Sequence, residues 1–301
     1  MNNRVYRSCK WLLDKLLANR IMTFREINAE WVMDTALSGG TDMLRKTFYN
    51  YRQTLKELFG VEVACKDGGD YAYYIRTPEI LLNDRLTGWM LNNLSVGESL
   101  MGCKSLSSRI VLENIPSSEG KLLVVTDAMQ KCCKLSFDYI RYGSKDRKQH
   151  TAEPWGLVLY HQRWYLLASF GREKKYTFGL DRMIEPRATA ESFEYNSSFD
   201  AASYFEDFYG IYDSGKPITK IIIRAFGDEC CYLRDLPIHK SQREIYRGNG
   251  YSDFMIELRP NKELTGYLLS RGDRLKVLSP DCIVEEMKES IWAMMSHYNH
   301  F

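Results

Sequence analysis

Features common in membrane, secreted and metal-binding proteins are missing from this sequence of 301 residues. It has no apolar run of the roughly 18 residues that a membrane span needs, and residues 1–10 carry basic side chains instead of the apolar stretch of a signal peptide. The 8 cysteines include vicinal pairs at 132–133 and 230–231 but no C-x-x-C spacing. We therefore expect a soluble, cytoplasmic protein with reduced thiols, no metal site and no membrane contact.

Catalytic signatures are also missing. The sequence holds 5 histidines and contains no H-E-x-x-H, no G-x-x-x-x-G-K-[ST] and no G-x-S-x-G motif. The absence of these motifs argues against a zinc hydrolase, a phosphate-binding loop enzyme and a serine hydrolase. We expect no enzymatic activity and no cofactor.

The net charge of the chain is small, because 41 basic and 39 acidic residues leave +2. This total gives no sign of a nucleic-acid partner, but the charges are unevenly distributed. The first 76 residues and the middle of the chain are basic, whereas the region from 187 onward is acidic. With 45% hydrophobic and 27% charged residues, the composition is that of a globular protein with about two or three domains.

The N-terminal region predicts helices followed by a hairpin. Apolar residues at helical spacing predict a helix over 5–19, and a capping box at Thr23 and Glu26 predicts a second helix from about Phe24. A third helix is expected to start at Thr41 or Asp42. Its expected core stripe is Leu44, Phe48, Tyr51, Leu55 and Leu58. Alternating residues on both sides of Asp67-Gly68-Gly69-Asp70 then predict a β-hairpin.

The opposite face of the third helix is cationic and polar, with no acid before Glu57. Arginine and lysine bind phosphate and guanine, and asparagine binds adenine, so this face suits a DNA major groove. Three helices and a hairpin predict a winged helix-turn-helix. The candidate DNA-contacting residues are Arg45, Lys46, Thr47, Tyr49, Asn50 and Arg52, with Lys66 on the hairpin. The alternative is that this face is merely solvated.

The remaining sequence predicts further parts of different kinds. Helical patterns with little net charge over 77–120 indicate a connector. From Leu135 the period changes to two, and several short strands separated by turns predict a small antiparallel barrel. Residues 218–298 predict a β-α-β-β-α-β order, which is typical of the ferredoxin-like arrangement.

The middle region resembles a known family. Phe137-Asp138-Tyr139, Glu153-Pro154-Trp155-Gly156-Leu157, Arg163-Trp164-Tyr165-Leu166 and Thr177-Phe178-Gly179-Leu180-Asp181-Arg182-Met183 occur in the order typical of the WYL domain. The resemblance implies an Sm-like β-barrel, usually found behind a winged helix-turn-helix in bacterial transcription factors, with a C-terminal extension. This chain departs from the family at Tyr176 and Gly179, where members commonly carry arginine.

The resemblance also implies a sensor that binds an anion, with single-stranded nucleic acid or a nucleotide-like molecule as the leading candidate. Residues 121–186 agree with this, since they hold 12 basic and 7 acidic residues among many aromatic ones. The candidate ligand-binding residues are Tyr139, Arg141, Arg163, Trp164, Tyr165, Tyr176 and Arg182. The alternatives are that Tyr139 and Trp164 only fill the barrel, and that Arg182 pairs with Asp181 or Glu185.

The expected fold class is α+β and multidomain. We expect a winged helix-turn-helix over 1–76, a helical connector over 77–120, a WYL sensor barrel over 121–190 and a ferredoxin-like extension over 191–301. The expected function is that of a homodimeric transcriptional regulator on a double-stranded DNA operator, with repression favoured and activation left open. The alternative is a single-stranded nucleic-acid-binding module or a regulatory subunit of a nucleic-acid-processing enzyme.

Overall fold

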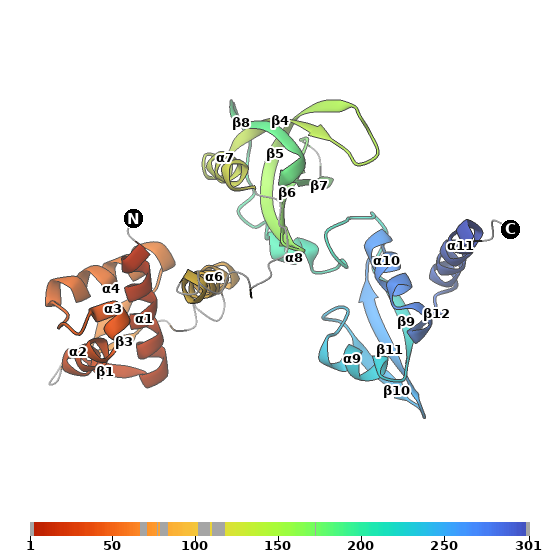
Figure 1. The fold of residues 1–301 in the computed structure, drawn as a ribbon. Coiled ribbons are helices and arrows are strands. Elements are labelled where there is room, and N and C mark those ends of the chain that lie inside the picture. Colours follow the sequence, from red (N-terminus) through yellow and green to blue (C-terminus); the bar gives the residue numbers. More distant parts are fainter. Residues whose placement is uncertain are drawn as a thin grey trace. The chain divides into compact units, whose positions relative to one another are not determined.

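The computed structural model describes residues 3–66, 71–76, 78, 84–101, 109, 118–171 and 173–298. The chain divides into two compact units, Met1–Glu113 and Asn114–Phe301, and each is described by itself. The fold is α+β, as expected, with three antiparallel sheets in the described parts of the chain (Figure 1).

The first unit combines helices with a small sheet. Its elements are α1 (Asn3–Asn19), β1 (Ile21–Thr23), α2 (Phe24–Met33), α3 (Thr35–Ser38), α4 (Arg45–Phe59), β2 (Val63–Cys65), β3 (Ala72–Ile75) and α6 (Arg85–Met101). The capping box at Thr23 and Glu26 is confirmed. The strand order is β1-β3-β2, so β1, which the sequence did not predict, completes a sheet with the hairpin strands. The hairpin turn, 67–70, and much of the predicted connector lie outside the described residues.

The predicted start of the third helix was wrong. Helix α4 begins at Arg45, with Leu44 as its N-cap. The side chain of Asn28 accepts a 2.7 Å hydrogen bond from the backbone N–H of Met43 and donates one of 2.7 Å to Asp42. These bonds hold the preceding segment in a non-helical path. At the other end, Gly60 adopts a φ of 66°, the left-handed conformation that commonly terminates helices.

The predicted core stripe of this helix is only partly correct. Phe48, Tyr51 and Leu55 are buried as expected. Leu44, however, is 70% exposed because it precedes the helix, and Leu58 is 37% exposed. Phe59, at 5% exposure, takes the core position instead. These buried side chains belong to one core that also includes residues of α1, α2 and the hairpin strands.

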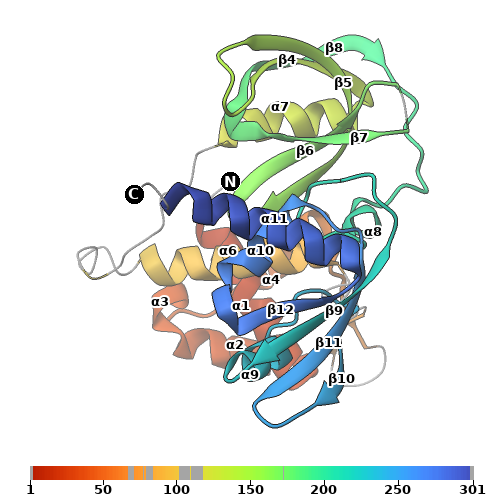
Figure 2. The same cartoon turned by 90° about the vertical axis from the view of Figure 1, so that its right-hand side faces the viewer.

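The second unit begins with a helix and a bent sheet. The elements are α7 (Glu119–Gln130), β4 (Cys133–Ile140), β5 (Arg147–Tyr160), β6 (Arg163–Ser169), β7 (Lys175–Gly179), the 3-10 turn η2 (Leu180–Arg182) and β8 (Met183–Ser192). The strand order is β7-β6-β5-β4-β8. The long β5 pairs with β4 along its first half and with β6 along its second. Helix α7 packs against β8, β4 and β5 (Figure 2).

The predicted alternation is confirmed on β4 but only partly elsewhere, since β6 buries four consecutive residues, 166–169, and Leu159 and Tyr176 are exposed. Leu135, Phe137 and Tyr139 on β4 are buried, as are Leu166 and Phe178 on neighbouring strands. Strand β8 was not predicted, because it is an edge strand in which only Met183 is buried. Edge strands of this kind lack the apolar alternation that identifies a half-buried strand.

A segment over residues 193–213, which we call the strap, follows β8 and contains the short helix α8 (Ala201–Phe205). After the strap come β9 (Thr219–Phe226), α9 (Glu229–Asp235), β10 (Arg243–Arg247), β11 (Tyr251–Leu258), α10 (Lys262–Ser270), η3 (Gly272–Arg274), β12 (Leu275–Ser279) and α11 (Asp281–Tyr298). The predicted β-α-β-β-α-β order is confirmed. The strands form one antiparallel sheet in the order β10-β11-β9-β12, which we call the C-terminal sheet.

The described residues contain free cysteines, and among them there is neither a membrane-spanning helix nor a cluster of metal ligands. The described cysteines are all free. None of the described helices is long and apolar enough to cross a membrane. Within the same described ranges, no three histidine, cysteine or acidic side chains are grouped as a metal site would require.

Candidate DNA-contacting helix and candidate ligand cavity

The face of α4 opposite its core stripe is exposed and polar. Lys46, Tyr49 and Asn50 are all exposed, Tyr49 to 55%. The helical period places Gln53 and Lys56 on the same side, one turn or two further along. Within the described parts of the chain, Lys46 and Lys56 form no ion pair. Exposed Glu57 lies on the same side at the far end of the helix. Among the described residues it forms no ion pair with either lysine, so this face offers cationic and amide groups.

Arg45 and Thr47 lie at the start of the same helix. Arg45 is exposed, and its guanidinium lies 4.7 Å from the centre of the Phe24 ring. Thr47 is half-buried. The first turn of a helix presents free backbone N–H groups and a partial positive charge, so both residues occupy a position that favours anions.

The Arg52 side chain contacts other residues of the first unit instead of extending into solvent. Its Nε and Nη2 donate hydrogen bonds of 3.0 and 2.7 Å to the backbone oxygen of Val63. The guanidinium also lies 5.0 Å from the centre of the Tyr73 ring. Arg52 thus joins α4 to both hairpin strands. This contact gives it a structural role beside the DNA contact that the sequence suggested.

Lys66 lies at the end of β2, on the hairpin. Its side chain is exposed, and its backbone N–H donates a 2.8 Å hydrogen bond to Ala72, which keeps the two strands paired. Lys66 is therefore held at the end of the paired strands, and a wing contacts DNA backbone from its hairpin.

A cavity of about 350 Å³ opens beside the bent sheet of the second unit. The sheet and the strap both contribute to its wall: Tyr139, Arg141, Leu167, Lys174, Lys175, Tyr176, Thr177, Phe178, Arg182, Tyr204, Ile211, Tyr212 and Asp213. Four basic side chains and one acidic side chain line it. The volume lies at the lower end of the range for small-molecule sites.

Arg182 is the most distinctive group of this wall. Its guanidinium lies 4.9 Å from the centre of the Tyr139 ring and 4.2 Å from that of Tyr142. Its Nε is buried without a hydrogen-bond partner among the described residues. A buried donor left unpaired is costly, and a ligand oxygen in the cavity would satisfy it.

The alternative of an ion pair between Arg182 and Asp181 is not what the structure shows. Asp181 pairs with Arg163 instead, at 3.4 Å. In the described ranges, Arg182 also makes no ion pair with Glu185. Its positive charge therefore remains available on the cavity wall.

Gly179 explains how Arg182 and Asp181 approach the sheet so closely. A Cβ atom at this position would lie 2.6 Å from Oδ1 of Asp181 and 3.3 Å from the Arg182 guanidinium. The backbone N–H of Gly179 donates a 3.0 Å hydrogen bond to the Tyr139 hydroxyl. Burial raises the pKa of Tyr139, so its hydroxyl keeps its proton at neutral pH. Gly179 thus allows a close approach of Asp181 and Arg182 in this chain.

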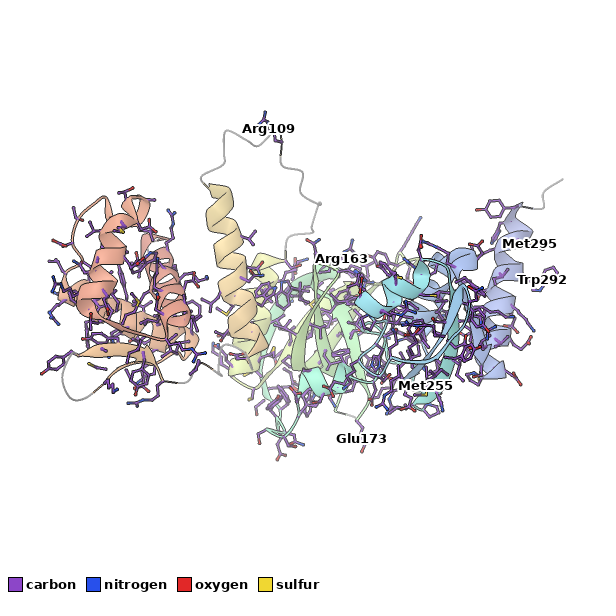
Figure 3. The ribbon with its side chains drawn as sticks, turned by 90° about the horizontal axis from the view of Figure 1, so that it is seen from below. Arg109, Arg163, Glu173, Met255, Trp292 and Met295 are labelled. Atoms are coloured by element: carbon purple, nitrogen blue, oxygen red, sulfur yellow. The ribbon has the colours of Figure 1, made fainter. Side chains whose placement is uncertain are left out.

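The structure brings together some of the predicted ligand-binding residues and separates others. Tyr139, Arg141, Tyr176 and Arg182 line the cavity. Trp164 instead packs against the core of the sheet, as its barrel-filling alternative predicted. Arg163, labelled in Figure 3, donates hydrogen bonds of 3.4 Å to the Asp181 carboxylate and 3.0 Å to the Tyr142 hydroxyl. Tyr165 lies opposite Gly179 in the strand ladder and is not part of the cavity wall.

The strap residues of the cavity and the two lysines of β7 and its preceding turn were not predicted from the sequence. Tyr204, Tyr212 and Asp213 come from the strap, and Lys174 and Lys175 from the neighbouring edge strand region. The Tyr204 hydroxyl donates a 3.1 Å hydrogen bond to Asp213, and burial raises the pKa of this tyrosine. The available signal was the high density of aromatic residues over 193–212, which has neither a strand nor a helix period.

Comparison with known proteins identifies one part of the chain. The family model of the WYL domain matches residues 120–188. A search of curated proteins returned no match. Among solved structures, proteasome accessory factor B/C (PafBC) of Arthrobacter aurescens is 21% identical with a TM-score of 0.31, over 80% of this chain and 39% of that chain.

A second solved structure, a CRISPR Cas-related protein, is 15% identical with a TM-score of 0.38, over 60% of this chain and 53% of that chain. This chain therefore spans less than two thirds of either protein. The family match covers α7, the five-stranded sheet and the cavity residues of that sheet. Residues 120–188 of this chain are a WYL domain.

Proposed function

We propose that this chain is a DNA-binding transcriptional regulator, not an enzyme, and that its first unit is a winged helix-turn-helix. The observation that supports this proposal most directly is the exposed face of α4. There Lys46, Tyr49 and Asn50 lie free of acidic partners among the described residues. A helix with these groups fits a major groove, in which asparagine can bind adenine and lysine can bind guanine or phosphate.

The surrounding elements support the same proposal. The order α1, β1, α2, α3, α4 and hairpin, with the sheet order β1-β3-β2, places α4 directly before the hairpin that Arg52 fastens to it. A hairpin held against the recognition helix can follow the DNA backbone with Lys66. The fixed geometry between helix and wing would let both contact one site.

The WYL domain, in this proposal, is an Sm-like barrel that senses an anion. The unpaired Nε of Arg182, together with Arg141 and Tyr176, suits a phosphate beside a base that stacks on an aromatic ring. We therefore favour single-stranded nucleic acid, entering by one end, or a nucleotide-like molecule. Repression is the favoured mode of regulation, and the ligand must bind the DNA-competent and incompetent states unequally to have any effect.

We further propose that the regulator is a homodimer and that its C-terminal part is a ferredoxin-like domain. Helix α11 buries only Ile283 and leaves Ile291, Trp292 and Met295 exposed to 50%, 67% and 43% (Figure 3). A second copy of the chain would cover this apolar face. A two-fold dimer would also match a palindromic operator, as in other helix-turn-helix proteins.

The replacement Lys46→Ala tests the proposal. It should weaken binding of the full chain to a random-sequence duplex and lower the slope of log affinity against log salt by about 1, because one phosphate contact is lost. Fluorescence anisotropy over a salt series measures both quantities. Lys131→Ala removes the same charge from the C-cap of α7 and serves as the control. An unchanged slope in Lys46→Ala would overturn the assignment of α4.

The cationic, aromatic cavity separately favours a second candidate, a single-stranded nucleic-acid-binding module without duplex recognition. The same titrations with single-stranded DNA distinguish the two. If Arg182→Gln abolishes all DNA binding while Lys46→Ala changes none of it, the second candidate is correct.

A further inference from the structure

Lys175 of β7 has its ammonium group enclosed by aromatic rings. Its Nζ lies 4.5 Å from the ring centre of Trp155, 4.8 Å from that of Phe199 and 5.8 Å from that of Tyr204. It also donates a 3.4 Å hydrogen bond to the backbone oxygen of Glu173. In the described parts of the chain, no carboxylate pairs with this ammonium. Aromatic faces attract cations, so this aromatic cage holds Lys175 without neutralising its charge.

The aromatic cage joins two separate parts of the second unit. Trp155 comes from β5 of the WYL domain, whereas Phe199 and Tyr204 come from the strap. Helix α8 of the strap lies so close to β5 that a Cβ at Gly156 would be 3.0 Å from that of Ala201.

Trp155 also packs directly against strap rings, with its ring centre 6.0 Å from that of Phe193, 5.5 Å from that of Tyr195 and 5.2 Å from that of Phe199. Lys175 adds a charged contact to this interface between the first half of the strap and the WYL sheet.

The second half of the strap is bonded to the C-terminal sheet and its helix α10. The Glu263 carboxylate accepts hydrogen bonds of 2.8 and 2.9 Å from the backbone N–H groups of Ile211 and Tyr212. Asn261 donates bonds of 2.8 Å each to the carbonyls of Tyr209 and Tyr212. These bonds tie this half of the strap to α10, while the Thr177 hydroxyl on β7 donates a 3.4 Å hydrogen bond to the carbonyl of Ile211.

Lys175 also lines the ligand cavity, on the same wall as Arg182. An anion bound to Arg182 would offer Lys175 a counter-charge, which the aromatic cage does not. Charge-assisted hydrogen bonds to phosphate are among the strongest that a lysine makes. The energetic preference of Lys175 would then shift from the rings to the ligand.

We propose that Lys175 is a switch between the aromatic cage and the cavity: an anion in the WYL cavity draws it out of the cage and releases the first half of the strap. The inference rests on the proposed anion site and adds its means of regulation. Release of the first half of the strap removes one of the contacts that connect the WYL sheet to the C-terminal sheet. Ligand binding in one domain thereby acts on the other.

The test uses the full chain with inorganic phosphate and adenosine 5′-monophosphate as probes. Calorimetry measures binding, and hydrogen exchange measures the release of residues 199–205. Trp155 fluorescence, taken as the difference between the wild type and Trp155→Phe, reports the cage. We expect a probe that binds through Arg182 to accelerate exchange of this segment and to change the Trp155 signal.

Two lysine variants separate the switch from a simple charge effect. Lys175→Met keeps an apolar side chain in the cage but removes the charge, so the probe should bind at least about fivefold more weakly and leave exchange of the strap unchanged. Lys174→Met removes an equal charge from the cavity wall outside the cage. It should retain the exchange response.

The possible results distinguish this inference from the proposed function. If the probes bind in an Arg182-dependent way but neither the Trp155 signal nor the exchange of 199–205 changes, the switch is wrong and the anion site stands. The switch is also wrong if Lys175→Met responds as the wild type does. If no probe and no single-stranded oligonucleotide binds, the anion site itself is wrong.

Discussion

Arg182 is the residue on which the proposed anion site most depends. It lies between two tyrosine rings, its Nε is buried and unpaired among the described residues, and the neighbouring acid Asp181 pairs with Arg163 instead. An arginine that contacts aromatic rings and has no paired carboxylate can bind an anionic group. Gly179 is part of the same arrangement, because a Cβ there would force the Asp181 carboxylate to move and would crowd the Arg182 guanidinium.

Replacing Arg182 with glutamine should weaken binding of a single-stranded oligonucleotide or a mononucleotide by at least about tenfold, since a charge-assisted hydrogen bond is lost. Calorimetry on the full chain measures this. Arg187→Gln on β8 removes an exposed arginine outside the cavity wall and should leave the affinity unchanged. Equal losses in both variants would mean that only overall charge matters.

Arg52 leads to a different expectation. Because its guanidinium binds the Val63 carbonyl and stacks on Tyr73, Arg52→Ala should destabilise the hairpin by about 1–3 kcal/mol. Hydrogen exchange of the β2 and β3 amides would show lower protection, while Arg45→Ala, at an exposed position on the same helix, would leave it unchanged. Full protection of the hairpin in Arg52→Ala would contradict the structural role of this side chain.

At the scale of elements, the sequence predicted what local chemistry determines. The capping box at Thr23, the period-two strands of the WYL sheet and the order of the C-terminal elements were all predictable. The start of α4 was not, because it depends on Asn28, which lies 14 and 15 residues before its partners Asp42 and Met43. Strand β1 is three residues long, and β8 is an exposed edge, so neither has an apolar pattern of its own.

The candidate site was predictable to the same extent. Residues that belong to the family motif, such as Tyr139 and Arg182, were found from their order in the sequence and do line the cavity. Arg163 and Tyr165 belong to the same family motif, but they do not line the cavity: Arg163 pairs with Asp181, and Tyr165 lies opposite Gly179 in the strand ladder. The strap residues are brought to the cavity only by tertiary structure, which a local pattern does not encode.

Helix α11 is the element on which the proposed dimer is most easily tested. Trp292→Glu places a charge on its exposed apolar face and should shift the sedimentation coefficient from that of a dimer to that of a monomer. Lys288→Ala changes an exposed lysine on the same helix that pairs with Glu285, and it should leave the dimer intact. A Trp292→Glu protein that sediments as the wild type does would exclude this face as the dimer contact.

At the scale of the whole molecule, the net charge of +2 is the sum of basic and acidic regions that lie in different parts of the chain. The first unit presents α4 with uncompensated cations, and the WYL cavity has four basic side chains against one acid. The acidic residues concentrate toward the C-terminal region. Two separate candidate contacts with phosphate therefore exist in a chain whose overall charge would not attract nucleic acid.

These two contacts have different expected partners, duplex DNA for α4 and a smaller anion for the cavity. A regulator needs both, together with a physical connection through which one affects the other. The strap provides a connection inside the second unit, because it touches the WYL cavity and is bonded to α10. This connection is what distinguishes a sensor from a domain that merely binds a ligand.

The most direct measurement of the central claim, that α4 reads duplex DNA, is selection from a random-sequence duplex library by the full chain and by Asn50→Ala. The account predicts that the wild type enriches a defined sequence and that Asn50→Ala loses discrimination at one adenine-containing position, at a cost of about 1–3 kcal/mol for that base pair. Failure of the wild type to enrich any sequence, or an identical enriched sequence from Asn50→Ala, would contradict it.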